Sequence, residues 1–203
     1  MDDRYLTIAK EARAEIKVKG SRFIGETFLV TDIAQALEKL NAVRKREHAA
    51  THHCYAWQVG LTEDMSFKYS DAGEPAGTAG KPIYDVIVGR EVTNILLVVT
   101  RYFGGTKLGT GGLARAYSNA ARTVMEQAGV KENFLTARFK IEFDFTHYDR
   151  WQKLISSLEV KTIDSTFTDR VSMVVEIRLN HAERLQETFV ELTGGKGKIE
   201  QVR

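Results

Sequence analysis

The arrangement of hydrophobic and polar positions predicts alternating strands and helices in two units with different rhythms. Alternation of apolar and polar residues is typical of half-buried strands, and apolar positions three or four residues apart are typical of one-faced helices. In the first unit a Gly20-Ser21 turn predicts a hairpin, and Asp32 with Gln35 forms a capping-box pattern. The expected order is ββαβαβα, with strands over Ala14–Lys19, Arg22–Val30, Tyr55–Val59 and Ile95–Thr100 and helices over about 32–46, 78–89 and 113–129.

The second unit is expected to have the order βαββαβ. Its strands are predicted over Leu135–Phe145, Val160–Phe167, Val171–Leu179 and Gly197–Val202, and its helices over about 147–158 and 182–193. This order is the split βαβ, ferredoxin-like arrangement, with helices on one face of an antiparallel sheet. We therefore expect an α+β protein with domains over 1–132 and 133–203, because Gly129 closes a helix just before the rhythm changes.

Composition restricts the class of partner. The 203 residues carry a formal charge of +2, with a hydrophobic content of 43%, enough for ordinary packed cores. The first unit carries +2 and the second 0, so a site for a polyanion is expected to be local. The single Cys54 forms no internal disulfide, and the chain shows no signal peptide or apolar run long enough to span a membrane. The expected location is the cytoplasm, with no membrane partner.

The stretch from Arg101 to Arg122 is the strongest candidate site. It contains five of the sixteen glycines, and no acidic residue occurs between Glu91 and Glu126. Glycine amides at a helix start beside cationic side chains favour an anion, most plausibly a phosphate. The alternative is a glycine hinge without a ligand. The candidate residues for phosphate or nucleic-acid binding are Arg101, Tyr102, Gly104, Gly105, Lys107, Gly109, Gly111, Gly112 and Arg115.

A second motif occupies Ser70–Pro82, where acidic residues stand among glycines and prolines. These carboxylates could act as acid and base or bind a cation, whereas a tight turn capped by acidic residues is the structural alternative. A phosphate-binding Walker loop is excluded because Pro75 stands where its first glycine is needed and Pro82 follows Lys81. The candidate residues of this motif, with two nearby histidines, are His52, His53, Asp71, Glu74, Thr78 and Lys81.

Two cofactor hypotheses are disfavoured. His48, His52, His53 and Cys54 lie within seven residues, but no second cluster supplies a further ligand pair, so no metal is expected. The GxGxxA pattern at Gly109–Ala114 lies in too long a loop for a dinucleotide-binding turn, and no cofactor is expected.

Four stretches of the sequence are characteristic when taken together. They read KGSRFIG (Lys19–Gly25), AATHHCYAW (Ala49–Trp57), SDAGEPAGTAGKP (Ser70–Pro82) and VVTRYFGGTKLGTGGLARAY (Val98–Tyr117). In these stretches the sequence resembles the IMPACT family in its bacterial YigZ-like branch. Ala72 stands where many relatives have a second aspartate, which weakens a metal role there.

The resemblance implies a ribosomal protein S5 domain 2-like N-terminal domain and a ferredoxin-like C-terminal domain similar to elongation factor G domain V. Eukaryotic relatives are translation regulators that act largely through an extra N-terminal domain, which this sequence is not expected to share. By analogy, the two fold types suggest a nucleic-acid or ribosome-linked role.

Three functions follow as hypotheses. The favoured one is a non-catalytic RNA-binding or ribosome-associated translation regulator, with Arg101, Lys107 and Arg115 on backbone phosphates and Tyr102 or Phe103 stacked on a base. The alternative is an enzyme acting on a small phosphorylated or nucleotide-like substrate through Asp71, Glu74 and His52 or His53, for which no nucleophile can be named. The third is a protein-interaction module that uses the C-terminal domain.

Overall fold

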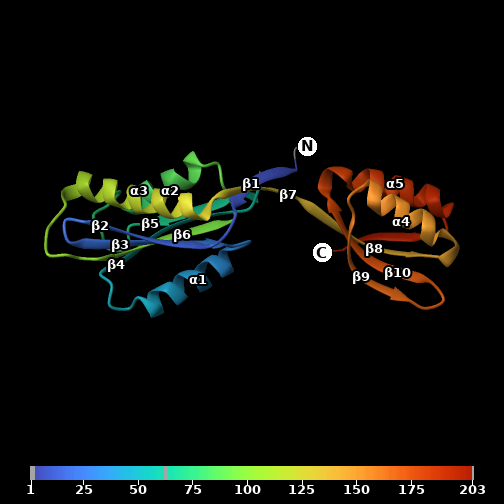
Figure 1. Ribbon diagram of the computed structural model, residues 1–203, viewed down its shortest axis with the longest axis horizontal. Coiled ribbons are helices and arrows are strands. Elements are labelled where there is room, and N and C mark those ends of the chain that lie inside the picture. The colour runs from blue at the N-terminus through green and yellow to red at the C-terminus, as the bar shows by residue number, and fades with distance from the viewer. Residues whose placement is uncertain (1–2, 62–63, 203) are drawn as a thin grey trace. The chain divides into compact units, whose positions relative to one another are not determined.

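A computed structural model describes residues 3–61 and 64–202 and shows a two-domain α+β protein (Figure 1). One compact unit is Tyr5–Asn133, and the other comprises residues 134–202 with Asp3 and Arg4. The strands of the first unit are β1 (Arg4–Ile8), β2 (Ala12–Val18), β3 (Ser21–Leu29), β4 (His52–Val59), β5 (Ser66–Ser70), β6 (Ile95–Tyr102) and β7 (Val130–Phe134). Its helices are α1 (Ile33–Arg46), α2 (Gly80–Gly89) and α3 (Gly109–Ala128).

The first unit is built on a five-stranded sheet of order β2-β3-β6-β4-β5, in which β6 runs antiparallel to both β3 and β4. Helix α1 covers one face, and α2 and α3 cover the other (Figure 1). Because side chains alternate along a strand, β6 supplies Leu97 and Val99 to the α2/α3 core and Leu96 and Val98 to the α1 core. The central strand is therefore buried on both faces, as its aliphatic sequence predicts.

Several local predictions are confirmed. Lys19 and Gly20 turn the β2–β3 hairpin with positive φ angles of 46° and 84°. Asp32 caps α1 by accepting the Gln35 backbone N–H at 2.8 Å.

Other features differ from the prediction. Strand β5 is absent from the expected order. It is a short edge strand whose Phe67 and Tyr69 are exposed, so its sequence lacks the alternation that marks a half-buried strand. The pairing of β1 with β7 was also missed, since these strands lie far apart in sequence. Helix α3 begins at Gly109, so the last three glycines of the motif form its first turn rather than a loop.

The second unit has the ferredoxin-like topology. Its elements are β8 (Thr136–Phe143), a 3₁₀ turn at Phe145–His147, α4 (Tyr148–Ser157), β9 (Lys161–Phe167), β10 (Val171–Arg178), a 3₁₀ turn at Leu179–His181, α5 (Ala182–Thr193) and β11 (Lys198–Val202). The antiparallel sheet has the order β11-β8-β10-β9, and both helices lie on one of its faces (Figure 1). Gly194 ends α5 in the left-handed conformation at φ 58°, as the Gly194-Gly195 pair predicts.

One glycine of the loop after β6 is required by a close backbone approach. A Cβ atom on Gly104 would lie 1.9 Å from the carbonyl carbon of Gly20 and 2.3 Å from the Ser21 nitrogen. No side chain fits there without moving the backbone. The β2–β3 turn and the loop after β6 are therefore packed main chain against main chain.

We predict that Gly104→Ala lowers the free energy of unfolding of the first unit by about 3 kcal/mol, because the new methyl group overlaps the Gly20 backbone. Urea unfolding followed by Trp57 fluorescence in a Trp151→Phe background reports this unit alone, since the chain has two tryptophans. The matched control is Gly89→Ala, where a Cβ meets no atom within 4 Å and stability should change by about 0.5 kcal/mol or less. Equal effects of the two substitutions would contradict the packing argument.

Candidate functional site

The candidate site begins with a row of three residues across the sheet on its α2/α3 face. Arg101 near the end of β6 pairs in register with Phe23 of β3 on one side and with His52 of β4 on the other. All three side chains point to the α2/α3 face, because neighbouring positions in paired strands share a face.

A buried ion pair links this row to the segment between β5 and α2. The Nη1 atom of Arg101 lies 2.6 Å from Oε1 of Glu74, and the two residues are 5% and 9% exposed. The same oxygen accepts the Tyr117 hydroxyl of α3 at 2.8 Å. Burial raises the pKa of Tyr117, so its hydroxyl stays protonated and donates to the carboxylate. Glu74 thus joins a strand, a loop and a helix at one atom.

Arg101 is further enclosed by aromatic rings. Its guanidinium carbon lies 5.4 Å from the ring centroids of both Phe23 and Phe103. Its Nη2 atom is 3.5 Å from the Ser21 hydroxyl, and its buried Nε has no hydrogen-bond acceptor among the residues described. The charge of Arg101 is offset by Glu74 inside the protein, so Arg101 is not the exposed phosphate ligand that the sequence suggests.

Asp71 holds the segment 71–79 in shape. Its carboxylate accepts backbone N–H groups of Gly77, Ala79 and Gly80, each at 2.9 Å, and so caps the start of α2. Burial acts to raise the pKa of Asp71, but these donors outweigh it, and the pKa lies below its ordinary value of 3.8. Thr78, a candidate residue of the second motif, donates its hydroxyl to the Pro75 carbonyl at 2.7 Å and makes no cap bond to α2.

The segments meet at a cavity of about 380 Å³. Glu74 and Pro75 line it from the 71–79 segment, and Arg101, Phe103, Lys107, Leu108, Gly109, Thr110 and Leu113 line it from β6, the following loop and α3. The sequence motifs at Ser70–Pro82 and Arg101–Arg122 therefore form one site. His52 stands beside it, with Nε2 4.0 Å from Glu74 Oε1 and Nδ1 2.9 Å from the Ala72 carbonyl oxygen.

The cavity opens beside a helix start that favours negative charge. The first turn of α3, from Gly109, contains no acidic residue, and Leu108 provides no side-chain cap. The backbone N–H groups of Gly109 and Gly111 therefore lie where an α-helix leaves its amides without helical acceptors. Lys107 lies just before this turn and Arg115 just after it, both exposed to solvent.

Other predicted residues lie elsewhere. Tyr102 and His53 point to the α1 face of the sheet, where Tyr102 donates to Glu47 at 2.8 Å and His53 Nδ1 lies 3.2 Å from the Thr100 hydroxyl. Lys81 is exposed on α2 and pairs with Asp85.

The remaining loop glycines have separate places. The Gly104 N–H donates to the Ser21 hydroxyl at 3.1 Å, and Gly105 turns the loop at φ 84° with open space around it.

The thiol near the site is not arranged for nucleophilic chemistry. Cys54 is fully buried and donates to the Asp71 carbonyl oxygen at 2.9 Å. Burial raises its pKa to about 12, so the thiolate is not formed near neutral pH. Across residues 3–61 and 64–202, no three His, Cys, Asp or Glu side chains gather as a metal-binding group.

Sequence reasoning missed the part played by Tyr117, which helical spacing places on the core face of α3. The sequence gives no sign of this hydrogen bond, because a tyrosine on the core face of a helix fits the apolar pattern whether or not its hydroxyl has a carboxylate partner.

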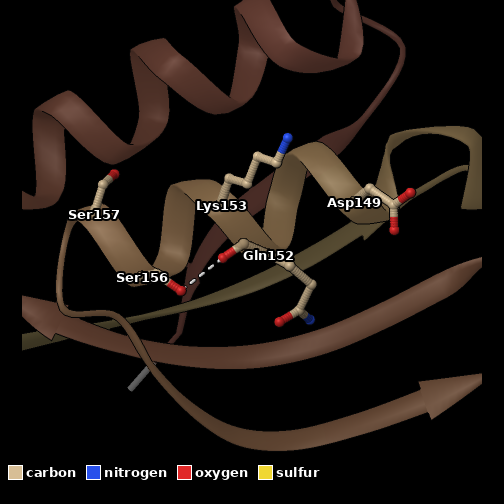
Figure 2. Close-up of a pocket in the computed structure, with 5 residues that line it drawn as sticks. All are labelled: Asp149, Gln152, Lys153, Ser156 and Ser157. Carbon is tan, nitrogen blue, oxygen red and sulfur yellow. Dashed lines mark hydrogen bonds between the residues drawn. The ribbon is translucent and has the colours of Figure 1, made fainter.

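A further cavity in the second unit carries no comparable site. Figure 2 shows that Asp149, Gln152 and Lys153 of α4 point in different directions, and the Ser156 hydroxyl donates to the Gln152 carbonyl of its own helix at 2.9 Å. These side chains do not converge on a common point.

The structure is thus that of a two-domain α+β protein in which two sequence motifs of the N-terminal domain line the same cavity. The family profile described as Impact N-terminal domain matches residues 19–125, and the one described as a domain of unknown function (DUF1949) matches residues 141–196. The chain belongs to the IMPACT family.

Relatives from several bacteria are similar over most of their length. The IMPACT family member YvyE of Bacillus subtilis is 31% identical over 97% of this chain and 90% of its own. The Escherichia coli IMPACT family member YigZ is 33% identical over 74% of each chain. A crystal structure described as that of a hypothetical protein matches all of this chain and 99% of its own, with 27% identity and a TM-score of 0.71.

Within the described ranges, no helix is both long enough and apolar enough to cross a membrane.

We predict that Glu74→Ala lowers the free energy of unfolding of the first unit by about 3–5 kcal/mol, because the buried Arg101 charge loses its partner. The double variant Arg101→Met/Glu74→Leu should cost less than either Glu74→Ala or Arg101→Ala, since it leaves no unpaired charge. Urea unfolding followed by Trp57 fluorescence measures all three variants. A double variant that loses as much stability as the two single variants together would contradict the interaction of these side chains.

The Asp71 cap predicts a pH dependence. A carboxyl group whose pKa is lowered by folding adds stability that is present above its unfolded-state pKa and is lost as the pH falls through the folded-state value. The stability difference between wild type and Asp71→Asn should therefore be largest near pH 7 and shrink below about pH 3.8. Unfolding free energies measured from pH 7 to pH 3 check this, and a difference that is constant over the range contradicts it.

Proposed function

We propose that this protein is a non-catalytic, translation-associated regulator of the cytoplasm that binds single-stranded RNA, free or within the ribosome. Membership of the IMPACT family supports the regulatory role, since the resemblance places translation regulators among its eukaryotic members. The observation that carries the RNA-binding part is a cavity with an exposed aromatic ring on one wall and a cationic helix start on another.

The helix start suits a backbone phosphate. Amides of the first turn of α3 point out of the helix without helical acceptors, and Lys107 adds a full positive charge beside them. In this proposal Arg115, which is exposed and follows the first turn of α3, contacts a neighbouring phosphate. Arg101 contributes a wall of the cavity rather than a phosphate contact, because Glu74 already offsets its charge.

The ring that receives a base in this proposal is Phe103 rather than Tyr102. Phe103 is 48% exposed and lines the cavity, whereas Tyr102 points to the other face of the sheet. Pro75, Leu108 and Leu113 add apolar surface around the space in front of it. A base stacked on an aromatic ring with its phosphate on cationic groups is the usual arrangement in proteins that bind single strands.

The enzyme alternative has one observation in its favour, the position of His52 4.0 Å from Glu74 beside the cavity. Against it, Asp71 is occupied by three backbone donors and is not available as the partner of Glu74. Thermal-shift measurements with nucleoside monophosphates separate the two functions, since stabilisation by these but no binding of RNA favours the enzyme.

We predict that a fluorescein-labelled mixed-sequence RNA of ten nucleotides binds at low salt and weakens as salt rises. Lys107→Ala should reduce the slope of log affinity against log salt by about 0.7, the value for one phosphate contact on a single strand. Phe103→Ala should weaken binding by about 1–3 kcal/mol, the range for one stacked base. Fluorescence anisotropy from 20 mM to 300 mM salt, about the range that exposes such slopes, is the measurement.

The matched control is Arg122→Ala, which removes an exposed charge from the same helix about 20 Å from its start. It should leave binding within a factor of about two. Absence of binding at low salt, or equal effects of Lys107→Ala and Arg122→Ala, would contradict the proposal.

A further inference from the structure

Glu74 has acceptor capacity that the protein does not use. An ionised carboxylate offers about four acceptor sites, two on each oxygen. Oε1 accepts the Arg101 guanidinium and the Tyr117 hydroxyl, and His52 at 4.0 Å is beyond hydrogen-bond distance. Among the residues described, none donates a hydrogen bond to Oε2. A carboxylate with one oxygen fully used and the other unused is thus part of the cavity wall.

The Glu74 carboxylate and the Phe103 ring share one neighbour, the guanidinium group of Arg101. Arg101 contacts Glu74 through Nη1 at 2.6 Å, and its guanidinium carbon is 5.4 Å from the Phe103 ring centroid. The carboxylate and the ring therefore flank the same guanidinium group. Glu74 and Phe103 also line the same cavity of about 380 Å³, so a planar base that enters this cavity meets both the ring and the carboxylate.

We propose that the cavity selects guanine, through hydrogen bonds from its N1–H and N2–H groups to the free oxygen of Glu74. This inference names the base within the RNA-binding function proposed above and rests on it. Arg101 is a positioning residue here, because it holds Oε1 and leaves Oε2 for the ligand.

Guanine fits because two N–H donors stand side by side on its Watson–Crick edge. Adenine and cytosine present one amino donor beside a ring-nitrogen acceptor, which a carboxylate repels. Uracil presents one N–H between two carbonyl oxygens, which are repelled in the same way. A buried carboxylate therefore discriminates against the other three bases as well as attracting guanine.

The test compares five-nucleotide RNAs that differ at the central position only. Four labelled oligonucleotides carry guanosine, inosine, adenosine or cytidine between pairs of uridines, and anisotropy with the full-length wild-type protein measures each dissociation constant. We expect guanosine to bind on the order of 10-fold more tightly than adenosine or cytidine. Inosine keeps N1–H and lacks the N2 amino group, so it should fall between guanosine and adenosine.

The protein variants assign the preference to Glu74. Glu74→Gln should bring guanosine and adenosine to within a factor of about two of each other, because the carboxamide offers a donor as well as an acceptor. The matched control Asp85→Asn removes an exposed carboxylate on α2 outside the cavity and should keep the preference. The comparison of guanosine with inosine needs no protein variant, so it tests the two-donor arrangement even if Glu74→Gln does not fold.

The outcomes separate this inference from the proposed function. Salt-dependent binding with equal affinity for guanosine and adenosine would overturn the guanine inference and leave RNA binding intact. Equal affinity for guanosine and inosine would overturn the two-donor arrangement. Failure of all four RNAs to bind at low salt would overturn both proposals.

Discussion

A charged pair inside the protein holds together the segments that form the site. Arg101 comes from the central strand, Glu74 from the segment before α2, and Tyr117 from α3, and all meet at one carboxylate oxygen. Without Glu74 the guanidinium would be an unpaired charge in the interior, and without Arg101 the carboxylate would be one. The wall of the cavity exists because these charges offset each other between β6 and the two helices that cover its face.

This pairing also sets the electrostatic character of the site. Four basic residues without an acid between Glu91 and Glu126 suggest a strongly positive surface, but one of the four is neutralised from outside that stretch. What remains at the cavity is the helix start with Lys107, and Arg115 follows on the same helix outside the cavity lining. The balance suits a single nucleotide with its phosphate better than a long groove that follows many phosphates.

The sequence predicts most of the fold and part of the site. The hairpin at Gly20, the cap at Asp32 and the strands and α-helices of the C-terminal domain follow from local patterns that the structure keeps. Strand β5 could not be predicted, because an exposed edge strand loses the alternation by which strands are recognised.

The site was harder to predict, because its key features depend on contacts between distant residues. A basic residue in a sequence gives no sign of the carboxylate that will neutralise it, so Arg101 was expected to face an anion. Tyr102 and His53 were candidates because each is adjacent in sequence to a residue on the cavity face, Arg101 or His52. Successive residues of a strand point to opposite faces of the sheet, so Tyr102 and His53 face away from the cavity.

The main-chain contact between Gly20 and Gly104 has a consequence for recognition. Together with the Ser21 and Thr51 hydroxyls, which accept the N–H groups of Gly104 and Phe103, it fixes the start of the loop before any ligand arrives. A ligand that meets an ordered ring avoids most of the conformational entropy that a loose loop would lose on association. In the proposed function, the glycines of this motif would therefore contribute through preorganisation of the loop as well as through their amides.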